Sequence, residues 1–369
     1  MTRYIWQLPA WPNLIRDDSA LLRPLGKTRQ AQGELFARAD YFELNLQADV
    51  LTEEAFTTAA IEGESLNRQA VRSSVARRLG LPTAGLPASD RHIDGLVEML
   101  IDATRNYATP LTASRLKGWQ ASLFPTGYAG LHRIVTGDWR RDKTPMQVIS
   151  GPVGKEKIHF EAPPAANVPA EIKQFLAWFK SSPDRLDGLV RAAEAHLRFV
   201  TIHPFADGNG RVARAITDMA LAQDEKKGFR LYSMSAQINA EREQYYNVLE
   251  RTQKGKGDIT EWIIWFLECL QRAMEQSALE INKVMDKARF WRNVADHNLN
   301  DRQKKAVNKL LDAGPGGFEG GLTNKKYRAM TRTTRETAKR DLIQLVGMGI
   351  LKKNPGGGRS VSYDLFWSE

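Results

Sequence analysis

The sequence has little cysteine and no long hydrophobic run. Cys269 is the only cysteine among the 369 residues, which excludes an intramolecular disulfide and a cysteine-rich zinc module. Apolar stretches such as 263–267 are far shorter than the roughly 20 residues that a membrane-spanning helix requires. The first residues lack the apolar segment and the small-residue cleavage site of a secretory signal. These absences predict a soluble cytoplasmic protein.

The best-known phosphate-binding signatures are also missing. The chain contains neither a Gly-x-x-x-x-Gly-Lys-Ser/Thr loop nor the set of motifs that marks a protein kinase. Its composition is otherwise that of a globular protein, with 42% hydrophobic and 26% charged residues, so wholesale disorder is excluded. The length is comfortable for two or three domains.

Positive charge is concentrated near the C-terminus. The formal net charge is +10, and residues 301–369 hold 14 basic against 7 acidic side chains. Helical stretches at 301–312, 323–330 and 333–347, followed by two short β-like runs around a glycine-rich loop, are typical of a winged helix-turn-helix. The charge predicts nucleic acid, DNA above all, as a partner. Docking of another protein, or of a second copy in a homodimer, is the alternative.

The predicted helix at 333–347 has an apolar stripe on one side. Basic residues lie next to its start and on its outer side, away from this stripe. They are Arg332, Arg335, Lys339 and Arg340. Arg359 falls at the predicted tip of the wing, where a contact with phosphate or with the minor groove would be natural.

The rest of the chain is mostly helical, with one break. The short alternating runs 146–150 and 157–160 flank a Gly-Pro-Val-Gly loop, which predicts a β-hairpin. We therefore expect a mainly α-helical protein in three parts, an N-terminal helical region at 1–105, a central domain at 106–292 and the winged helix at 293–369.

One short segment, 203–214, combines several groups that bind anions. Gly208 and Gly210 permit positive φ angles and leave backbone N–H groups uncovered, so the segment can form a concave anion-binding nest. A helix that begins near Arg211 would point its positive end at the same place. Arg211 and Arg214 are three residues apart, so both guanidinium groups can face one polyphosphate.

Two further side chains of this segment complete a site for phosphate transfer. Asp207 offers an oxygen ligand for Mg²⁺, an ion that bridges phosphates. His203 lies four residues earlier, and its imidazole is suited to act as a general base at neutral pH. A base, a metal-binding carboxylate, an anion nest and two arginines within 12 residues predict phosphate-transfer chemistry.

The segment from His203 to Arg214 fits the signature His-x-Phe-x-Asp/Glu-Gly-Asn-Gly-Arg-x-x-Arg and resembles that of Fic-domain proteins. The resemblance implies a helical Fic core that is a Mg²⁺-dependent protein adenylyltransferase, moving AMP from ATP to a Ser, Thr or Tyr hydroxyl of a target protein. It also implies that His203 deprotonates this hydroxyl and that Asp207 holds Mg²⁺ between the α- and β-phosphates.

The same resemblance implies which residues of the loop bind each phosphate of ATP. Arg211 would neutralise the β-phosphate and the leaving pyrophosphate, and Arg214 would neutralise the γ-phosphate. The backbone amides that would cradle the anion belong to Gly208, Asn209 and Gly210, together with the Asn209 side chain.

Two other segments resemble parts of Fic proteins. Tyr245 and Tyr246 are similar to the segment that closes over adenine and ribose, although tyrosines at helical positions also pack in protein cores. The hairpin at 146–160 is similar to the flap at which a target would add as a β-strand.

A third resemblance concerns regulation. Residues 58–63, Thr-Ala-Ala-Ile-Glu-Gly, fit the Ser/Thr-x-x-x-Glu-Gly/Asn pattern of an inhibitory helix, here expected at about 51–63. The spacing places Thr58 and Glu62 on one helical face. The resemblance implies that Glu62 pairs with Arg214 and occupies the γ-phosphate site. A glutamate that merely ends an ordinary helix is the alternative.

Three functional hypotheses therefore remain open from the sequence. The first is the adenylyltransferase, autoinhibited by Glu62. The second is an enzyme that removes AMP from a modified protein or uses another phosphate donor. The third is a DNA-binding regulator whose Fic core only senses nucleotide.

Overall fold

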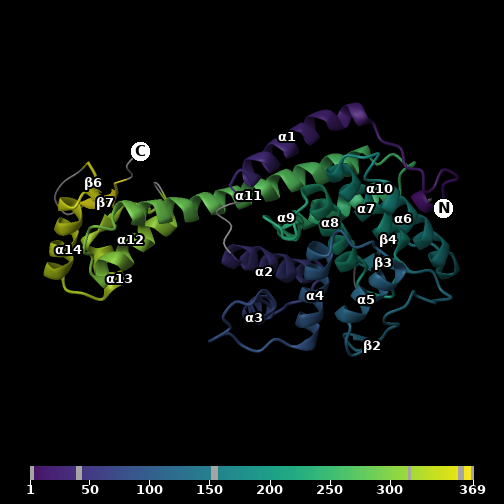
Figure 1. Cartoon of the computed structure of the whole chain (residues 1–369), viewed down its shortest axis with the longest axis horizontal. Coiled ribbons are helices and arrows are strands. Elements are labelled where there is room, and N and C mark those ends of the chain that lie inside the picture. Colours follow the sequence, from purple (N-terminus) through teal and green to yellow (C-terminus); the bar gives the residue numbers. More distant parts are fainter. Residues whose placement is uncertain (1–3, 39–43, 151–156, 315–316, 356–360, 367–369) are drawn as a thin grey trace. The chain divides into compact units, whose positions relative to one another are not determined.

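The structure is a computed structural model that describes residues 4–38, 44–150, 157–314, 317–355 and 361–366. In these ranges the chain is mostly helical, as predicted, and it divides into two compact units, Met1–Ser277 and Ala278–Glu369 (Figure 1). None of the described helices combines the length and the apolar character that crossing a membrane requires.

Helices make up most of the first unit. They are α1 (Asp18–Phe36), α2 (Leu44–Ile61), α3 (Arg68–Leu79), α4 (Arg91–Arg105), α5 (Ala113–Leu123), α6 (Val168–Ser181), α7 (Gly188–Ile202), α8 (Asn209–Glu225), α9 (Met234–Ala240), α10 (Arg242–Gln253) and the start of α11 (Thr260–Asn293), with short 3₁₀ turns η1 (Ile5–Gln7) and η3 (Ala165–Asn167). The first unit also contains two antiparallel strand pairs, β1 (Tyr128–Ala129) with β2 (His132–Arg133), and β3 (Gln147–Ser150) with β4 (Lys157–Glu161).

The packed pair α7 and α8 forms the centre of the first unit. Residues 189–202 of α7 are all buried, and so are residues 211–222 of α8. Alanine is frequent in both helices, which lets them pack closely, and charged side chains buried on them find partners, as Arg198 does with Glu194 at 2.6 Å. The burial of both helices holds both ends of the connecting loop, residues 203–208, in place.

The predicted hairpin at 146–160 is confirmed by β3 and β4. The two strands are antiparallel, with Val148 opposite Phe160 and a shift of register immediately after Val148. Phe160 is buried against Tyr4 of the N-terminal segment, with ring centroids 5.2 Å apart. The predicted loop between the strands, 151–156, lies outside the described residues.

Helix α2 contains the predicted inhibitory segment but begins earlier than expected. The sequence indicates a helix from about residue 51, whereas α2 starts at Leu44 and ends at Ile61. The helix packs against α3, α4, α8 and α9, which explains why Thr57, Thr58 and other polar residues on it are buried. Glu62 and Gly63 follow in a turn, so the predicted glutamate lies just beyond the helix end.

The second unit contains the end of α11, three further helices and a small sheet. These elements are α12 (Asp301–Ala313), β5 (Leu322–Thr323), α13 (Asn324–Thr331), α14 (Arg335–Gly347), β6 (Leu351–Lys353) and β7 (Ser362–Leu365). The sheet is antiparallel in the order β5-β7-β6. Three helices and a hairpin occur at the predicted positions, and a winged helix-turn-helix stays a prediction for this unit. The predicted wing tip, including Arg359, is outside the described residues.

Candidate active site

The loop between α7 and α8 is built around an unusual turn at His203. The backbone of His203 is left-handed, with φ 52° and ψ 58°, and its N–H still donates to the Phe199 carbonyl at 3.0 Å. Phe205 is fully buried, 5.0 Å from the ring of Trp139 and 6.3 Å from that of Phe199. Phe205 thus anchors the loop in the core, while the chain reverses at His203.

Asn209 holds this loop closed. Its side-chain amide donates to the Phe205 carbonyl at 2.8 Å, and its side-chain oxygen accepts from the Phe205 N–H at 2.9 Å. Both ends of the amide are therefore used inside the loop, a role that the sequence pattern did not predict. Of the predicted anion-binding groups on Asn209, the backbone N–H at the start of α8 is the one that this arrangement leaves for a ligand.

Gly208 is required by the geometry of the loop, and Gly210 leaves room for the Glu62 carboxylate. Gly208 has φ 87°, and a side chain there would press against Phe124 and Leu123. At Gly210 a methyl group would collide with the Glu62 carboxylate, which lies directly over the backbone. The Glu62 side chain is therefore seated on the first turn of α8, where backbone N–H groups and the helix dipole favour a negative group.

Arg214 connects α8 to α2 through three hydrogen bonds. Its Nε donates to the Thr58 hydroxyl at 2.6 Å, and its Nη2 donates to the Thr58 carbonyl and to Glu62 Oε1, both at 2.8 Å. The structure thus pairs Glu62 with Arg214, as the resemblance implied, and adds two contacts of Arg214 with Thr58 that were not predicted. Burial alone would raise the pKa of Glu62, but the charge and hydrogen bond of Arg214, with the charges of Arg211 and His203, hold this pKa below its ordinary value.

Arg211 is held by residues that the sequence analysis missed. Its Nη1 donates to Glu64 Oε2 at 3.0 Å, and its guanidinium lies 5.0 Å from the centroid of the Phe124 ring. His92 pairs with the other oxygen of Glu64 and bonds through Nδ1 to the Leu123 carbonyl at 2.7 Å. The hydrogen bond with Glu64 raises the pKa of His92. No sequence motif links these residues, which come from three separate segments.

Each of the two arginines has one buried N–H donor that is left over for a ligand. Arg211 Nε and Arg214 Nη1 are buried and have no hydrogen-bond partner in the described part of the protein. Buried donors without partners are costly, and such groups are expected where a ligand is meant to bind. The two side chains are only 4% and 3% exposed, so a phosphate that reached them would be largely removed from water.

His203 is oriented for proton transfer. Its Nδ1 is 3.2 Å from the Val200 carbonyl, which requires the hydrogen to be on Nδ1 and leaves the Nε2 lone pair free. Burial lowers the pKa of His203 to about 4. The imidazole is therefore neutral, and able to accept a proton, throughout the physiological pH range.

A cavity of about 400 Å³ opens beside these groups. Its walls include Glu62, His203 and Gly210 from the loop side, Val148, Ile149 and Phe160 from the hairpin, and Tyr245 and Tyr246 from α10. The predicted base, the predicted inhibitory glutamate and the predicted flap thus share one cavity. A volume of this size is in the range of small-molecule sites.

The two tyrosines of α10 differ in their surroundings. Tyr245 is 2% exposed, and its hydroxyl is 3.0 Å from His196 Nε2, deep in the core. Tyr246 is 38% exposed and donates to the carbonyl of Ile61, the last residue of α2, at 3.2 Å. Tyr246 therefore offers the larger surface to a ligand, while Tyr245 mainly supports the wall.

Asp207 fits the role of a single carboxylate ligand for a divalent ion. Its side chain is 47% exposed, so carboxylate oxygens are accessible, and Oδ1 accepts from the Gly208 N–H at 2.6 Å. Among the described residues no three His, Cys, Asp or Glu side chains converge in a way that could hold a metal. The residues present thus suit an ion bound by one carboxylate and by the phosphates of a substrate.

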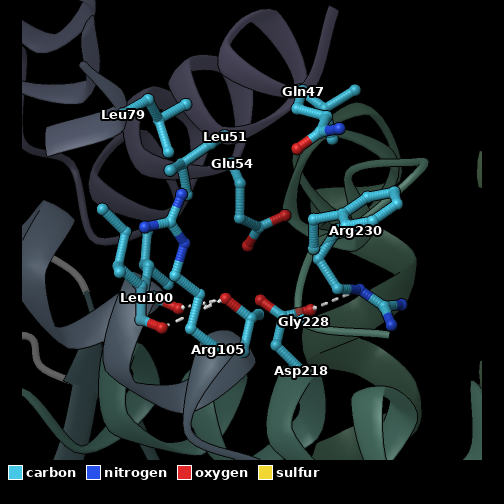
Figure 2. A pocket seen from close by; sticks show the side chains of 13 residues that line it. Gln47, Leu51, Glu54, Leu79, Leu100, Arg105, Asp218, Gly228 and Arg230 are labelled. Atoms are coloured by element: carbon cyan, nitrogen blue, oxygen red, sulfur yellow. Dashed lines mark hydrogen bonds and ion pairs between the residues drawn. The ribbon is translucent and has the colours of Figure 1, made fainter. Parts of the chain in front are cut away.

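A second, smaller cavity lies under α2 and is not part of this site. Figure 2 shows Glu54, Asp218 and Arg230 around it, and its volume is only about 30 Å³, enough for water. Glu54 accepts hydrogen bonds from the Ser233 hydroxyl at 2.7 Å and the Ser235 N–H at 3.0 Å. Burial, with the nearby charge of Glu54, raises the pKa of Asp218 well above its ordinary value. The hydrogen bonds of Glu54 hold α2 against the start of α9.

Comparison with known families agrees with the position of the loop. The model of the Fic/DOC family matches residues 110–221, and that of a domain of unknown function (DUF4172) matches residues 4–81. The Fic match includes the whole loop from His203 to Arg214, whereas the segment with Glu62 falls in the other match.

Relatives of known name are similar to this chain over a limited stretch. The protein adenylyltransferase Fic of Nematostella vectensis is 33% identical over 115 residues, which are 31% of this chain and 25% of that protein. The protein of the same name from Culex quinquefasciatus is 30% identical over 105 residues, 28% of this chain and 19% of its own length. The chain thus spans a quarter or less of these two relatives.

Solved structures match over more of the chain. A Fic family protein from Desulfovibrio desulfuricans G20 superposes with a TM-score of 0.55 at 18% identity, covering 95% of this chain and 97% of that one. A Fic domain containing signaling protein from Bacteroides thetaiotaomicron gives a TM-score of 0.51 at 20% identity, covering 69% and 98%. At such identities the likeness concerns the fold. Taken with the family match and the loop geometry, it shows that this chain contains a Fic/DOC family domain, at residues 110–221, and has the fold of Fic family proteins.

Proposed function

We propose that the chain is a protein adenylyltransferase that moves AMP from ATP to a hydroxyl of a target protein, and that Glu62 restrains it. The observation that carries the proposal is the seat of the Glu62 carboxylate, which lies on the backbone of Gly210 and against Arg214, in the cavity that His203 lines. A place that accepts a carboxylate in this way offers the same N–H donors and positive charge to a phosphate.

His203 would act as the base. Its Nε2 would take the proton of the target hydroxyl, while the hydroxyl oxygen forms a bond to the α-phosphorus of ATP. The bond from this phosphorus to the bridging oxygen of the β-phosphate breaks, and pyrophosphate leaves with the electron pair. The imidazolium then returns its proton to solvent, so charge and atoms balance.

The remaining residues of the loop would bind the phosphates. Arg211 and Arg214 would neutralise charge on the β- and γ-phosphates through their unpartnered donors. The N–H groups at the start of α8 would hold the anion in place. Asp207 would hold Mg²⁺, which when bound neutralises phosphate charge.

The Glu62 carboxylate would compete with the γ-phosphate for Arg214. Two negative groups cannot share one guanidinium and one helix terminus without repulsion. The transfer reaction in the native protein would therefore be slow until Glu62 is displaced.

The test is AMP transfer from ATP labelled at the α-phosphate to protein. We expect Glu62→Ala to raise the transfer rate at least about tenfold, and His203→Ala in that background to lower it by about 100-fold or more, the scale of a lost general base. Glu53→Ala is the matched control, because Glu53 lies on α2, the helix that Glu62 follows, and pairs with Arg68 on the surface. A Glu62→Ala protein that labels neither itself nor lysate proteins contradicts the proposal.

A second candidate reaction is removal of AMP from a modified protein. It is favoured by one observation, that Glu62 and His203 line the same cavity, where a carboxylate could orient an attacking water. Mass spectrometry separates the two reactions: a gain of mass on the target in the presence of ATP supports transfer, and loss of AMP from a modified protein that requires Glu62 supports removal.

A further inference from the structure

The second unit contains a strongly basic segment that the proposed reaction does not use. Residues 322–353 contain nine basic and two acidic side chains. One of the acids, Asp341, is 1% exposed and accepts hydrogen bonds from the Tyr327 hydroxyl at 2.9 Å and from Arg302 Nε at 3.0 Å. Asp341 therefore pairs with Arg302 of α12 and does not neutralise the basic residues of 322–353. Glu336 is the one exposed acidic residue of this stretch.

Six of these nine basic residues lie on two helices, α13 and α14, which are joined by a tight turn. Helix α13 ends at Thr331, and Arg332 adopts a left-handed conformation with φ 53°. Thr334 then caps α14 by accepting from the Thr337 N–H at 3.3 Å. A turn of three residues between two helices is the connection of a helix-turn-helix.

Helix α14 has one face in the core and one face in solvent. Ala338, Leu342 and Leu345 are 0–1% exposed and belong to the core of the second unit. Arg335, Lys339 and Arg340 are exposed, and in the described part of the chain none of the three forms an ion pair. Long cationic side chains without a partner project from the first two turns of the helix.

Exposed basic residues also lie on two elements that contact α14. Lys352 and Lys353 are exposed on β6, which follows α14 after a short turn. On α13, Lys325 and Arg328 are exposed as well. Positive charge thus flanks α14 on both sides in the sequence and in the fold.

We propose that this face binds duplex DNA, with α14 in the major groove and the lysines of β6 on the phosphate backbone. The major groove of B-form DNA is about 12 Å wide and admits an α-helix, whereas the corresponding groove of an RNA duplex is too narrow for side chains to read. The basic residues would neutralise phosphates and release counter-ions. This binding site is separate from the AMP-transfer site and does not depend on it.

The test uses the full chain and fluorescence anisotropy of a labelled 30-base-pair duplex of mixed sequence, titrated in NaCl from 50 to 200 mM. We expect a dissociation constant of about 1–100 µM for a duplex without a specific site, and a steep fall of affinity with salt. The variant R335A/K339A/R340A should bind at least about tenfold more weakly, and its salt slope should be smaller by about 2 to 3, since each phosphate contact contributes about 0.9.

The matched control is K304A/K305A/K309A. It removes the same number of positive charges from exposed positions of α12 in the same unit, so it separates a defined binding face from total charge. Lys339→Glu is a second variant, used if the triple variant shows altered circular dichroism, and it should weaken binding by a similar factor. R335K/R340K keeps both charges and should retain binding to the mixed duplex.

Three results would overturn the proposal. One is the absence of binding by the native chain at 100 µM protein in 50 mM NaCl. Another is equal weakening by the α12 control and the α14 variant. The third is a native dimer that the α14 variant converts to monomers without any binding to DNA, which would assign the face to a second copy of the chain. Loss of AMP transfer with retained DNA binding would count against the adenylyltransferase proposal alone.

Discussion

At the scale of single residues, the buried imidazole of His196 and the half-buried imidazole of His203 determine how stability depends on pH. Burial lowers the pKa of His203 to about 4 and the pKa of His196 to about 3, against about 6.5 in an unfolded chain. Between about pH 4 and 6.5 the unfolded state therefore binds more protons than the folded state. The free energy of unfolding is greatest above pH 6.5 and decreases as the pH falls through this interval.

Thermal unfolding at pH 7.5 and pH 5.5 measures this effect. The His196 ring nitrogens lie 3.0 Å from the hydroxyls of Thr217 and Tyr245. We expect the native protein to lose more stability over this interval than His196→Gln, because glutamine can still bond to both hydroxyls but does not take up a proton. His92 contributes with the opposite sign, since its pKa is raised by Glu64, and it is present in both proteins. Equal losses in the two proteins would show that His196 does not titrate as its burial requires.

Residue patterns in the sequence predicted the residues of the loop better than the contacts that hold these residues in place. The contacts of Glu62 with Arg214 follow a pattern within each of two short segments, and the structure places them as predicted. Glu64 and Arg211 are 147 positions apart, and nothing in either segment indicates that they meet. The double hydrogen bond of Asn209 to Phe205 was also not predicted, because the same side chain is equally suited to bind phosphate.

At the scale of elements, the end of α2 meets the start of α8 through two ion pairs. Glu62 holds Arg214, and Glu64 holds Arg211. The predicted inhibitory helix at 51–63 includes Glu62, so its pair with Arg214 was predicted. Glu64 lies outside this segment, and its pair with Arg211 was not predicted. Each arginine is therefore already paired with a carboxylate before any phosphate arrives.

The second pair predicts an effect on ATP binding. In the Glu62→Ala background, Glu64→Gln should lower the KM for ATP about threefold, because Arg211 no longer gives up its ion pair with Glu64 when it binds phosphate. The maximal rate should change less, since the contact with phosphate exists before and during the reaction. Initial rates over a range of ATP concentrations measure this. Glu98→Gln, an exposed glutamate on α4, is the control, and an unchanged KM in the Glu64 variant would contradict the role of the pair.

At the scale of the whole molecule, the chain has two units with separate cores. Among the described residues, the core cluster of the second unit extends from Phe290 to Leu365. The sequence-based boundary at residue 292/293 falls at the end of α11, whereas the compact units divide after Ser277. The difference arises because α11 is one continuous helix of 34 residues, and no break in the sequence marks the point at which its neighbours change.

Separate cores predict that damage to one unit leaves the other functional. Leu342→Ala removes a side chain that is 1% exposed, and a cavity of this kind costs about 2–5 kcal/mol. Calorimetry should show a lower unfolding temperature for the second unit, and the Glu62→Ala protein carrying this change should keep its rate of AMP transfer. A loss of transfer that accompanies the unfolding of the second unit, at temperatures where the first unit is still folded, would contradict the independence of the two cores.

The three hydrogen bonds from Arg214 to Thr58 and Glu62 have a thermodynamic consequence for any molecule that moves α2. If ATP can reach Arg214 only after these bonds open, the cost of opening them is subtracted from the affinity for ATP. A partner that draws the end of α2 away then strengthens ATP binding, and ATP strengthens the hold of that partner by the same factor. In the cell this coupling would act in both directions: a high ATP concentration would strengthen the binding of the partner, and the bound partner would raise the affinity for ATP.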